Sequence, residues 1–105
     1  VFVARQVDGL LVFLAPGDEA EVERALGDKP AVFLSRRPQH LRGDVVMPDT
    51  AGGTRQCVRN LIERGHRRIG LVTGPLVLST NRDRVDGWTT ELKKAKLPSP
   101  AALVV

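Results

Sequence analysis

The sequence predicts an α/β fold in which helices cover a parallel sheet. Short, continuous apolar runs alternate with longer amphipathic segments along the whole chain. Apolar runs without polar alternation are typical of strands buried on both faces, and strands that alternate with helices favour a parallel arrangement. Gly and Pro residues separate most of these segments, as they do at the ends of strands and helices.

Three apolar runs in the first half of the chain are expected to be buried strands. They are Leu10 to Leu14, Ala31 to Leu34 and Asp44 to Met47. Between the first two, acidic residues begin a helix and complement the dipole at its amino end. The apolar residues of this helix are expected on one face, since they recur at helical spacing; they are Val22, Ala25 and Leu26. Residues 1 to 6 are expected to form a strand or the last turn of a helix.

The passage from Asp44 to Gly74 predicts a βαβ unit. Asp49 and Thr50 are suited to the start of a helix from Ala51 to Arg64, and Gly65 is suited to its end. Ile69 to Thr73 is predicted as the next strand. Ligands bind at the carboxyl ends of strands in such units, so the residues after each strand are candidates for a site.

The helix of this unit is expected to bury one stripe of apolar side chains. Val58, Leu61 and Ile62 have the required spacing, and Cys57 is expected to be a small buried residue. Two glycines near the start of the helix, at positions 52 and 53, lower its intrinsic stability. They are expected to permit close backbone packing.

A last helix is predicted after the loop that begins at Gly74. Ser79, Thr80 and Asn81 are residue types that cap helix amino ends. The apolar residues that follow at helical spacing are expected to face the core; they are Val85, Trp88, Leu92 and Ala95. Leu103 to Val105 is typical of the start of a further strand, and we expect the sequence to be part of a longer protein.

Composition excludes several classes of protein. With 105 residues, 42% hydrophobic and 27% charged, the chain is typical of one small folded domain. The net charge of +4 comes from basic pairs scattered among acids, which favours solvated surfaces over a phosphate-binding stripe. A single cysteine excludes an internal disulfide and a multi-cysteine zinc site, and no apolar run approaches the length of a membrane span.

Catalytic sequence patterns are absent. The chain has no nucleophile elbow, Walker phosphate loop, dinucleotide-binding glycine pattern or His-Glu-x-x-His zinc pattern. Its two histidines, His40 and His66, stand apart from cysteines and paired carboxylates in the sequence. We interpret His66 as a structural residue at a helix carboxyl end, with a metal or general-base role as the alternative. The sequence therefore predicts neither an enzyme nor a cofactor or metal site.

The candidate site is the segment from Gly74 to Arg84, which joins a strand carboxyl end to a helix amino end. Free backbone N–H groups, hydroxyls and a charged side chain meet there. Arg84 offers a fork of donors suited to vicinal hydroxyls, a carboxylate or a purine edge. The alternative is that Ser79 and Thr80 only cap the helix and that Arg84 is a surface ion-pair partner. Asp49 is interpreted as a helix cap, as an acceptor facing a cleft, or as both.

The order of these passages resembles the effector-binding core of lactose-repressor-type (LacI/GalR) transcription regulators. The resemblance rests on four features: the strand-Asp-cap-helix passage that leads to Gly65-His66-Arg67-Arg68-Ile69, the pattern Arg84-Val-Asp-Gly87-Trp88 after Thr80, and the phrases Val7 to Leu11 and Pro30 to Leu34. It covers nearly the whole chain. In that family the hydroxyl and the Arg of the last helix contact the effector. The chain departs from the family at Thr50, where Asn is usual, and at Ser35, where many members have an acidic residue.

The resemblance implies a fragment of a two-lobed, periplasmic-binding-protein-like fold. Residues 1–48 would form a later part of the first, N-terminal effector-binding lobe, and residues 49–105 an early part of the second, C-terminal lobe. The expected ligand contacts are Arg84, Thr80, Ser79, Asp49 and Ser35. The ligand would be a small effector, such as a sugar or related metabolite, held in an interlobe cleft.

The implied function is ligand-controlled transcription. A cytoplasmic, homodimeric parent protein would bind DNA through an N-terminal headpiece that this chain lacks, with no part in contact with a membrane. A periplasmic or transporter-linked sugar-binding protein of the same fold is the alternative. A small flavodoxin-like enzyme or phosphoacceptor domain is a third interpretation; it requires an acidic cluster at the strand ends, where only Asp49 qualifies.

Overall fold

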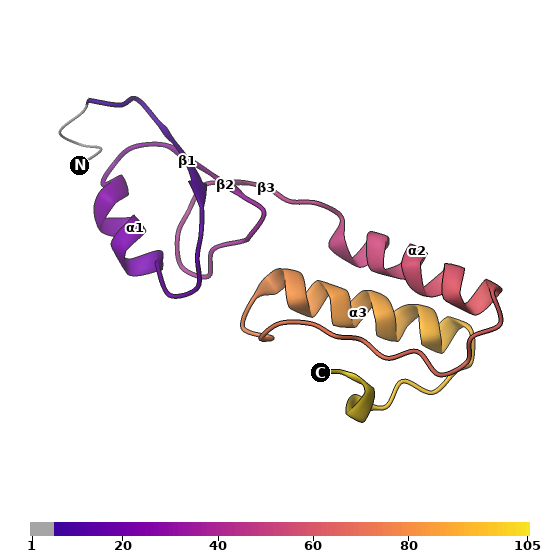
Figure 1. Ribbon diagram of the computed structural model, residues 1–105. Coiled ribbons are helices and arrows are strands. Elements are labelled where there is room, and N and C mark those ends of the chain that lie inside the picture. Colours follow the sequence, from indigo (N-terminus) through magenta and orange to yellow (C-terminus); the bar gives the residue numbers. More distant parts are fainter. Residues whose placement is uncertain (1–5) are drawn as a thin grey trace. The chain divides into compact units, whose positions relative to one another are not determined.

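The structure is a computed structural model that describes residues 6–105. The chain divides into two compact units, Val1–Pro48 (unit 1) and Asp49–Val105 (unit 2), and each has its own hydrophobic core. Figure 1 follows the elements of both. The prediction for residues 1 to 6 lies almost entirely outside the described residues. No helix within residues 6–105 is both long enough and apolar enough to cross a membrane.

Unit 1 contains a three-stranded parallel sheet in the order β1 (Leu10–Phe13), β2 (Ala31–Leu34) and β3 (Asp44–Val46). Helix α1 (Glu19–Leu26) connects β1 to β2. The predicted strands are therefore present, and β1 and β3 each end one residue earlier than expected.

The core of unit 1 lies on one face of this sheet. Leu14, Leu26 and Phe33 are buried, and Val22 of α1 packs against them. On β1 and β3 the side chains alternate, leaving Leu11 70% and Phe13 71% exposed. The expectation that these strands are buried on both faces is thus wrong within the described residues, because α1 covers one face.

Unit 2 is built on two helices, α2 (Thr50–Glu63) and α3 (Ser79–Lys94). They run in the same direction, so that both amino ends lie at the same end of the unit (Figure 1). The core consists of Val58, Ile69, Trp88 and Leu92, and the Trp88 indole Nε1–H donates a 3.0 Å hydrogen bond to the Ile69 carbonyl. A short 3₁₀ helix, η1 (Ala101–Leu103), follows.

The predicted strand from Ile69 to Thr73 is reduced to an isolated parallel bridge between Leu71 and Val104. The Leu71 amide donates to the Leu103 carbonyl at 2.7 Å, and the Val105 amide donates to the Leu71 carbonyl at 2.9 Å. Only the short segment after η1 supplies partners here, so the ladder among the described residues stays too short for a full strand.

Helix α2 buries a narrower stripe than expected. Val58 is buried and Ile62 packs beside it, but Leu61 is 38% exposed and Cys57 is exposed. Both predictions are wrong for the same reason. Helix α3 covers the face of α2 that carries Val58 and Ile62, whereas Cys57 and Leu61 lie on the adjacent, exposed face. Likewise Ala95, expected in the core, is exposed beyond the last turn of α3.

The two glycines of α2 differ. A Cβ at position 52 would clash with the Asp49 carboxylate, whereas a Cβ at Gly53 would meet nothing within 4 Å. The close approach of the helices instead occurs at Gly87, where a Cβ would clash with the Ala51 carbonyl oxygen.

The carboxyl end of α2 closes as predicted at Gly65, which has a φ of 93°. The His66 backbone N–H donates to the Leu61 carbonyl at 3.1 Å, and the Arg67 side chain donates to the Ile62 carbonyl at 3.2 Å. The helix end is therefore satisfied by the His66 backbone and by the neighbouring arginine.

Candidate functional site

The candidate site lies at the end of unit 2 where α2 and α3 both begin. The extended segment after Ile69 leads into the loop at Gly74 and Pro75, and α3 follows it directly. The amino ends of both helices lie at this end, and their partial positive charge favours ligands that carry negative charge or lone pairs.

Asn81 organises this segment. Its side chain is buried, its Nδ2 donates to the Pro75 carbonyl at 2.9 Å, and its Oδ1 accepts a 2.6 Å hydrogen bond from Nη1 of Arg84. A Cβ at Gly74 would lie 2.8 Å from Asn81 Nδ2, so the glycine admits the amide. The sequence identified Asn81 only as a possible capping residue. Its position one helical turn before Arg84 is the signal that could have indicated a hydrogen bond between the two side chains.

The loop before α3 is also held from its outer side. Nη1 of Arg82 donates to the carbonyls of Leu76 and Val77, each at 2.8 Å. Asn81 and Arg82 therefore fix the loop from two adjacent positions, and the Arg84 guanidinium is oriented by a neutral amide.

The predicted capping role of Ser79 and Thr80 is wrong. Leu78 is the N-cap, with φ −83° and ψ 128°, and it provides no side-chain hydrogen bond; Ser79 and Thr80 are already inside the helix. The Ser79 hydroxyl is instead buried without a hydrogen-bond partner, and so is the Thr73 hydroxyl at the end of the preceding segment. Buried polar groups without partners are uncommon in folded proteins.

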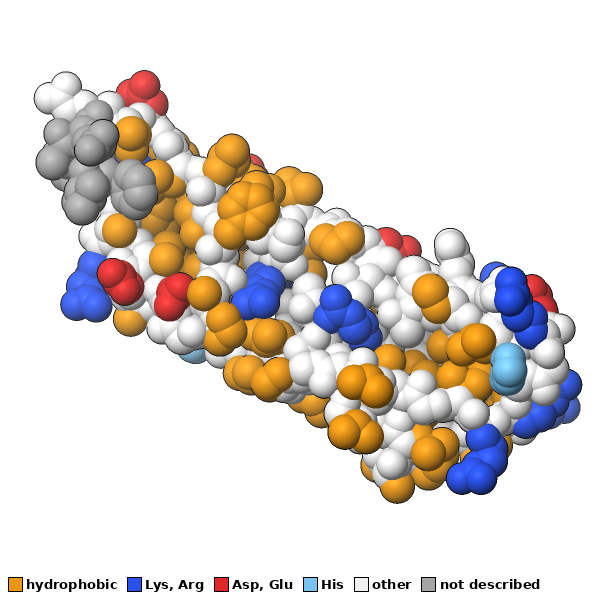
Figure 2. All heavy atoms as spheres, in the orientation of Figure 1, with side chains coloured by type: hydrophobic (Ala, Val, Ile, Leu, Met, Phe, Trp, Pro, Cys, Tyr) orange, Lys and Arg blue, Asp and Glu red, His pale blue; other side chains and the backbone are white. Residues whose placement is uncertain are grey.

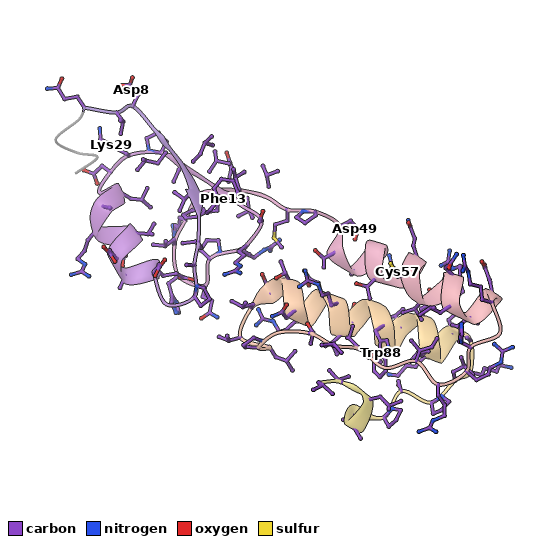
Figure 3. The ribbon with its side chains drawn as sticks, viewed as in Figure 1. Asp8, Phe13, Lys29, Asp49, Cys57 and Trp88 are labelled. Carbon is purple, nitrogen blue, oxygen red and sulfur yellow. The ribbon has the colours of Figure 1, made fainter. Side chains whose placement is uncertain are left out.

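Asp49 caps α2, as one of its two interpretations predicted. Its Oδ1 accepts a 2.8 Å hydrogen bond from the Gly52 amide, and the residue remains exposed (Figure 3). A carboxylate has about four acceptor positions, so capping leaves capacity for a ligand hydroxyl.

Ser35 stands at the end of β2 in unit 1. Its φ of 67° lies in the left-handed region, which is unusual for a residue other than glycine, and its amide donates to the Val46 carbonyl at 2.9 Å. The structure thus groups Ser79, Thr80 and Arg84 on α3, with Asp49 capping the neighbouring helix. Ser35 belongs to the other unit, and its place in the same site stays a prediction.

The grouped residues in unit 2 provide a guanidinium, hydroxyls and helix amides, a set suited to oxygen-rich ligands. Within residues 6–105, no group of three or more His, Cys, Asp or Glu side chains is placed to hold a metal ion.

Comparison with known proteins gives no matching family model. Among curated proteins, the chain is 36% identical over 102 residues to the "Probable HTH-type transcriptional regulator EndR" of Paenibacillus polymyxa, covering 91% of this chain and 29% of that protein. It is 33% identical over 94 residues to the ribose operon repressor of Haemophilus influenzae, covering 89% and 28%. The chain therefore spans less than a third of the length of these relatives.

The chain is also similar to solved structures of transcriptional regulators. A regulatory protein of the LacI family from Chloroflexus aggregans matches with a TM-score of 0.81 and 28% identity, over 99% of this chain and 37% of that one. The complex of the transcriptional regulator CelR with cellobiose matches with a TM-score of 0.79 and 29% identity, over 98% and 32%.

Proposed function

Because the homologues of this chain are LacI-family transcriptional regulators over about 90% of its length, we propose that it is part of the ligand-sensing domain of a bacterial regulator. The fold is the periplasmic-binding-protein-like α/β fold of that family. The proposed ligand is a small effector, a sugar or related metabolite, bound between two lobes to which residues 1–48 and 49–105 contribute. DNA binding is assigned to a headpiece outside these 105 residues.

The observation that carries the proposal is the geometry around Arg84. Asn81 orients the guanidinium through a neutral hydrogen bond of 2.6 Å, so the positive charge stays uncompensated. The buried Ser79 and Thr73 hydroxyls in the same segment have no partners. A ligand rich in hydroxyl groups would offer acceptors to the Arg84 guanidinium. One relative is named for the ribose operon and one similar structure holds cellobiose, which supports a sugar as the ligand class.

Regulation requires that the effector bind one lobe arrangement better than the other, since equal affinity for both shifts nothing. In the proposed mechanism, contacts from both lobes are made together only in the closed arrangement, and closure alters the geometry of the headpiece. The proposed protein performs no catalysis, acts in the cytoplasm and works as a homodimer.

The test is the substitution Arg84→Ala in the regulator that carries this chain, with ribose and cellobiose as probes in titration calorimetry. Loss of a charge-assisted hydrogen bond of about 1.5 to 3 kcal/mol weakens binding about 10- to 150-fold. Release of operator DNA by the effector is lost as well, while DNA binding without effector is retained.

Lys93→Ala is the matched control, because it removes one positive charge from an exposed position on the same helix, in the last turn and away from the candidate site. It should leave the affinity for the probe nearly unchanged. Equal affinity in wild type and Arg84→Ala would contradict the assignment of Arg84, and a collapsed thermal melt would make it a structural residue. A coding sequence without a helix-turn-helix upstream would instead favour a transport-linked sugar-binding protein.

A further inference from the structure

The carboxyl ends of α2 and α3 bring together basic residues that are far apart in the sequence. The two helices run side by side, and the salt bridge from Arg59 to Glu91, 2.8 Å long, lies about one turn before both ends. Ile62 and Leu97 pack against the same core. We define the basic end as the six cationic residues Arg64, Arg67, Arg68, Lys93, Lys94 and Lys96. Figure 2 shows Lys and Arg side chains gathered at this end of unit 2.

This end accounts for the positive charge of the whole protein. Residues 63–68 and 93–96 contain these six cations and one acid, Glu63. The rest of the sequence carries ten Lys and Arg against eleven Asp and Glu, close to neutrality. The six side chains are exposed, and none forms a salt bridge among the described residues. The scatter of basic pairs in the sequence therefore becomes one patch in the structure.

Helix dipoles explain part of this arrangement. Cations in the last turn are stabilising because the helix carboxyl end carries a partial negative charge, and Lys93 and Lys94 lie in the last turn of α3. Arg68 and Lys96, however, lie beyond the helices. Unpaired like charges repel one another and destabilise the compact state. A polyanionic partner would offset that repulsion.

We propose that the basic end binds the phosphate backbone of duplex DNA without sequence preference. Arginine guanidinium groups match phosphate oxygens in fork geometry, and closely spaced cations suit the regular phosphates of a duplex. The choice of DNA over an acidic protein rests on the proposed function, that of a transcription regulator, and on the three arginines of the basic end, whose guanidinium forks suit phosphate oxygens. Effector binding at the opposite end of unit 2 is not involved, so the two proposals fail separately.

The test measures binding of this 105-residue chain to a fluorescent duplex of arbitrary sequence by anisotropy, from about 25 to about 100 mM KCl. The logarithm of affinity should fall linearly with the logarithm of salt, with a slope of about −4 to −5 for four to six neutralised phosphates. The triple variant Arg64→Gln, Arg68→Gln, Lys94→Gln should make that slope shallower by about 3.

The control variant removes the same charge elsewhere: Arg24→Gln, Arg37→Gln, Arg42→Gln, all exposed in unit 1. It should leave the slope unchanged. Circular dichroism verifies the fold, and Arg68, Lys93 and Lys96 replace the first triple if helix content falls. Equal slopes for the two variants, or no binding at the lowest salt, would overturn the proposal. Tighter binding of poly-glutamate than of DNA would also overturn it, in favour of an acidic protein.

Discussion

At the scale of single residues, the partner of Arg84 is what makes it suited to a ligand. Asn81 accepts from its guanidinium without neutralising it, and within the described residues no carboxylate forms a salt bridge with it. A positive charge held in place but not compensated is pre-organised for an electron-rich group. The same segment contains the buried hydroxyl of Ser79, which has no hydrogen-bond partner and therefore costs folding free energy.

Ser79→Ala should therefore separate stability from binding. Removing an unsatisfied buried hydroxyl should leave the free energy of unfolding unchanged or raise it by up to about 1 kcal/mol. Effector affinity of the regulator should fall about tenfold, equivalent to about 1.4 kcal/mol. Thermal melts and calorimetry measure the two quantities.

Thr90→Ala is the control for helix propensity, since Thr90 is exposed on the same helix. It should leave effector affinity unchanged. If Ser79→Ala destabilises the fold and binds normally, the hydroxyl is structural.

The sequence located this segment but assigned its hydroxyls wrongly. Residue types identify the start of a helix, yet the N-cap is decided by backbone torsion angles, and here Leu78 takes the extended conformation. Ser79 and Thr80 consequently lie inside the helix. Asn81 could not be assigned, because its bond to Pro75 depends on how the loop folds back.

At the scale of elements, the α2–α3 pair depends on a close contact that helical periodicity does not reveal. Gly87 faces Ala51 and the Cβ of Thr54 at a distance that leaves no room for a side chain. Periodicity located Trp88 and Leu92 because they are large and apolar. It missed Glu91, which is buried beside Leu92 and paired with Arg59 on α2.

Gly87→Ala should separate the two helices. The added methyl group would clash with backbone of α2, and overpacking of this kind costs about 1 to 3 kcal/mol. Gly53→Ala is the matched control, because its Cβ would meet nothing within 4 Å in the same pair of helices. That variant should gain about 0.5 to 1 kcal/mol from helix propensity. Urea titrations of both variants measure whether the free energy of unfolding falls for Gly87→Ala and rises for Gly53→Ala. A Gly87→Ala protein as stable as wild type would contradict the packing argument.

The Arg59–Glu91 pair makes the stability of the fold depend on pH in the acidic range. The hydrogen bond from Arg59 lowers the pKa of Glu91 below its ordinary value of 4.5, against the opposing effect of burial. A carboxyl with a lowered pKa contributes stability that is complete above its unfolded value and is lost as pH falls through the folded value. The same contact raises the pKa of Arg59, which matters only in strong alkali.

We therefore expect wild type to lose more stability than Glu91→Gln as pH falls from about 5 to about 3. Asp86→Asn, exposed on the same helix, should keep the wild-type acid response. If wild type and Glu91→Gln lose the same amount of stability over this pH range, the ion pair does not contribute to folding.

At the scale of the whole molecule, the sequence predicted the fold class and a division at residue 48, where the compact units meet along the chain. Assignment of those units to two lobes remains a prediction, because it concerns neighbours outside these 105 residues. The sequence could not reveal the basic end, since the carboxyl ends of α2 and α3 come to the same end of unit 2 only through helix packing. In the first half of α3 the charges balance instead, because Arg82 and Arg84 alternate with Asp83 and Asp86.

This distribution leads to a prediction about DNA. Sequence-specific recognition is proposed for a separate headpiece, and the basic end lies at the carboxyl ends of α2 and α3 and in the segments beyond them. Binding to phosphates alone carries no sequence information. The isolated chain should therefore bind an operator duplex and a scrambled duplex equally, and both complexes should dissociate by about 150 mM salt. Competition anisotropy with the two duplexes measures the ratio. A complex that prefers the operator at that salt would require a recognition element within this chain, and would contradict its assignment as a sensor that acts through a separate headpiece.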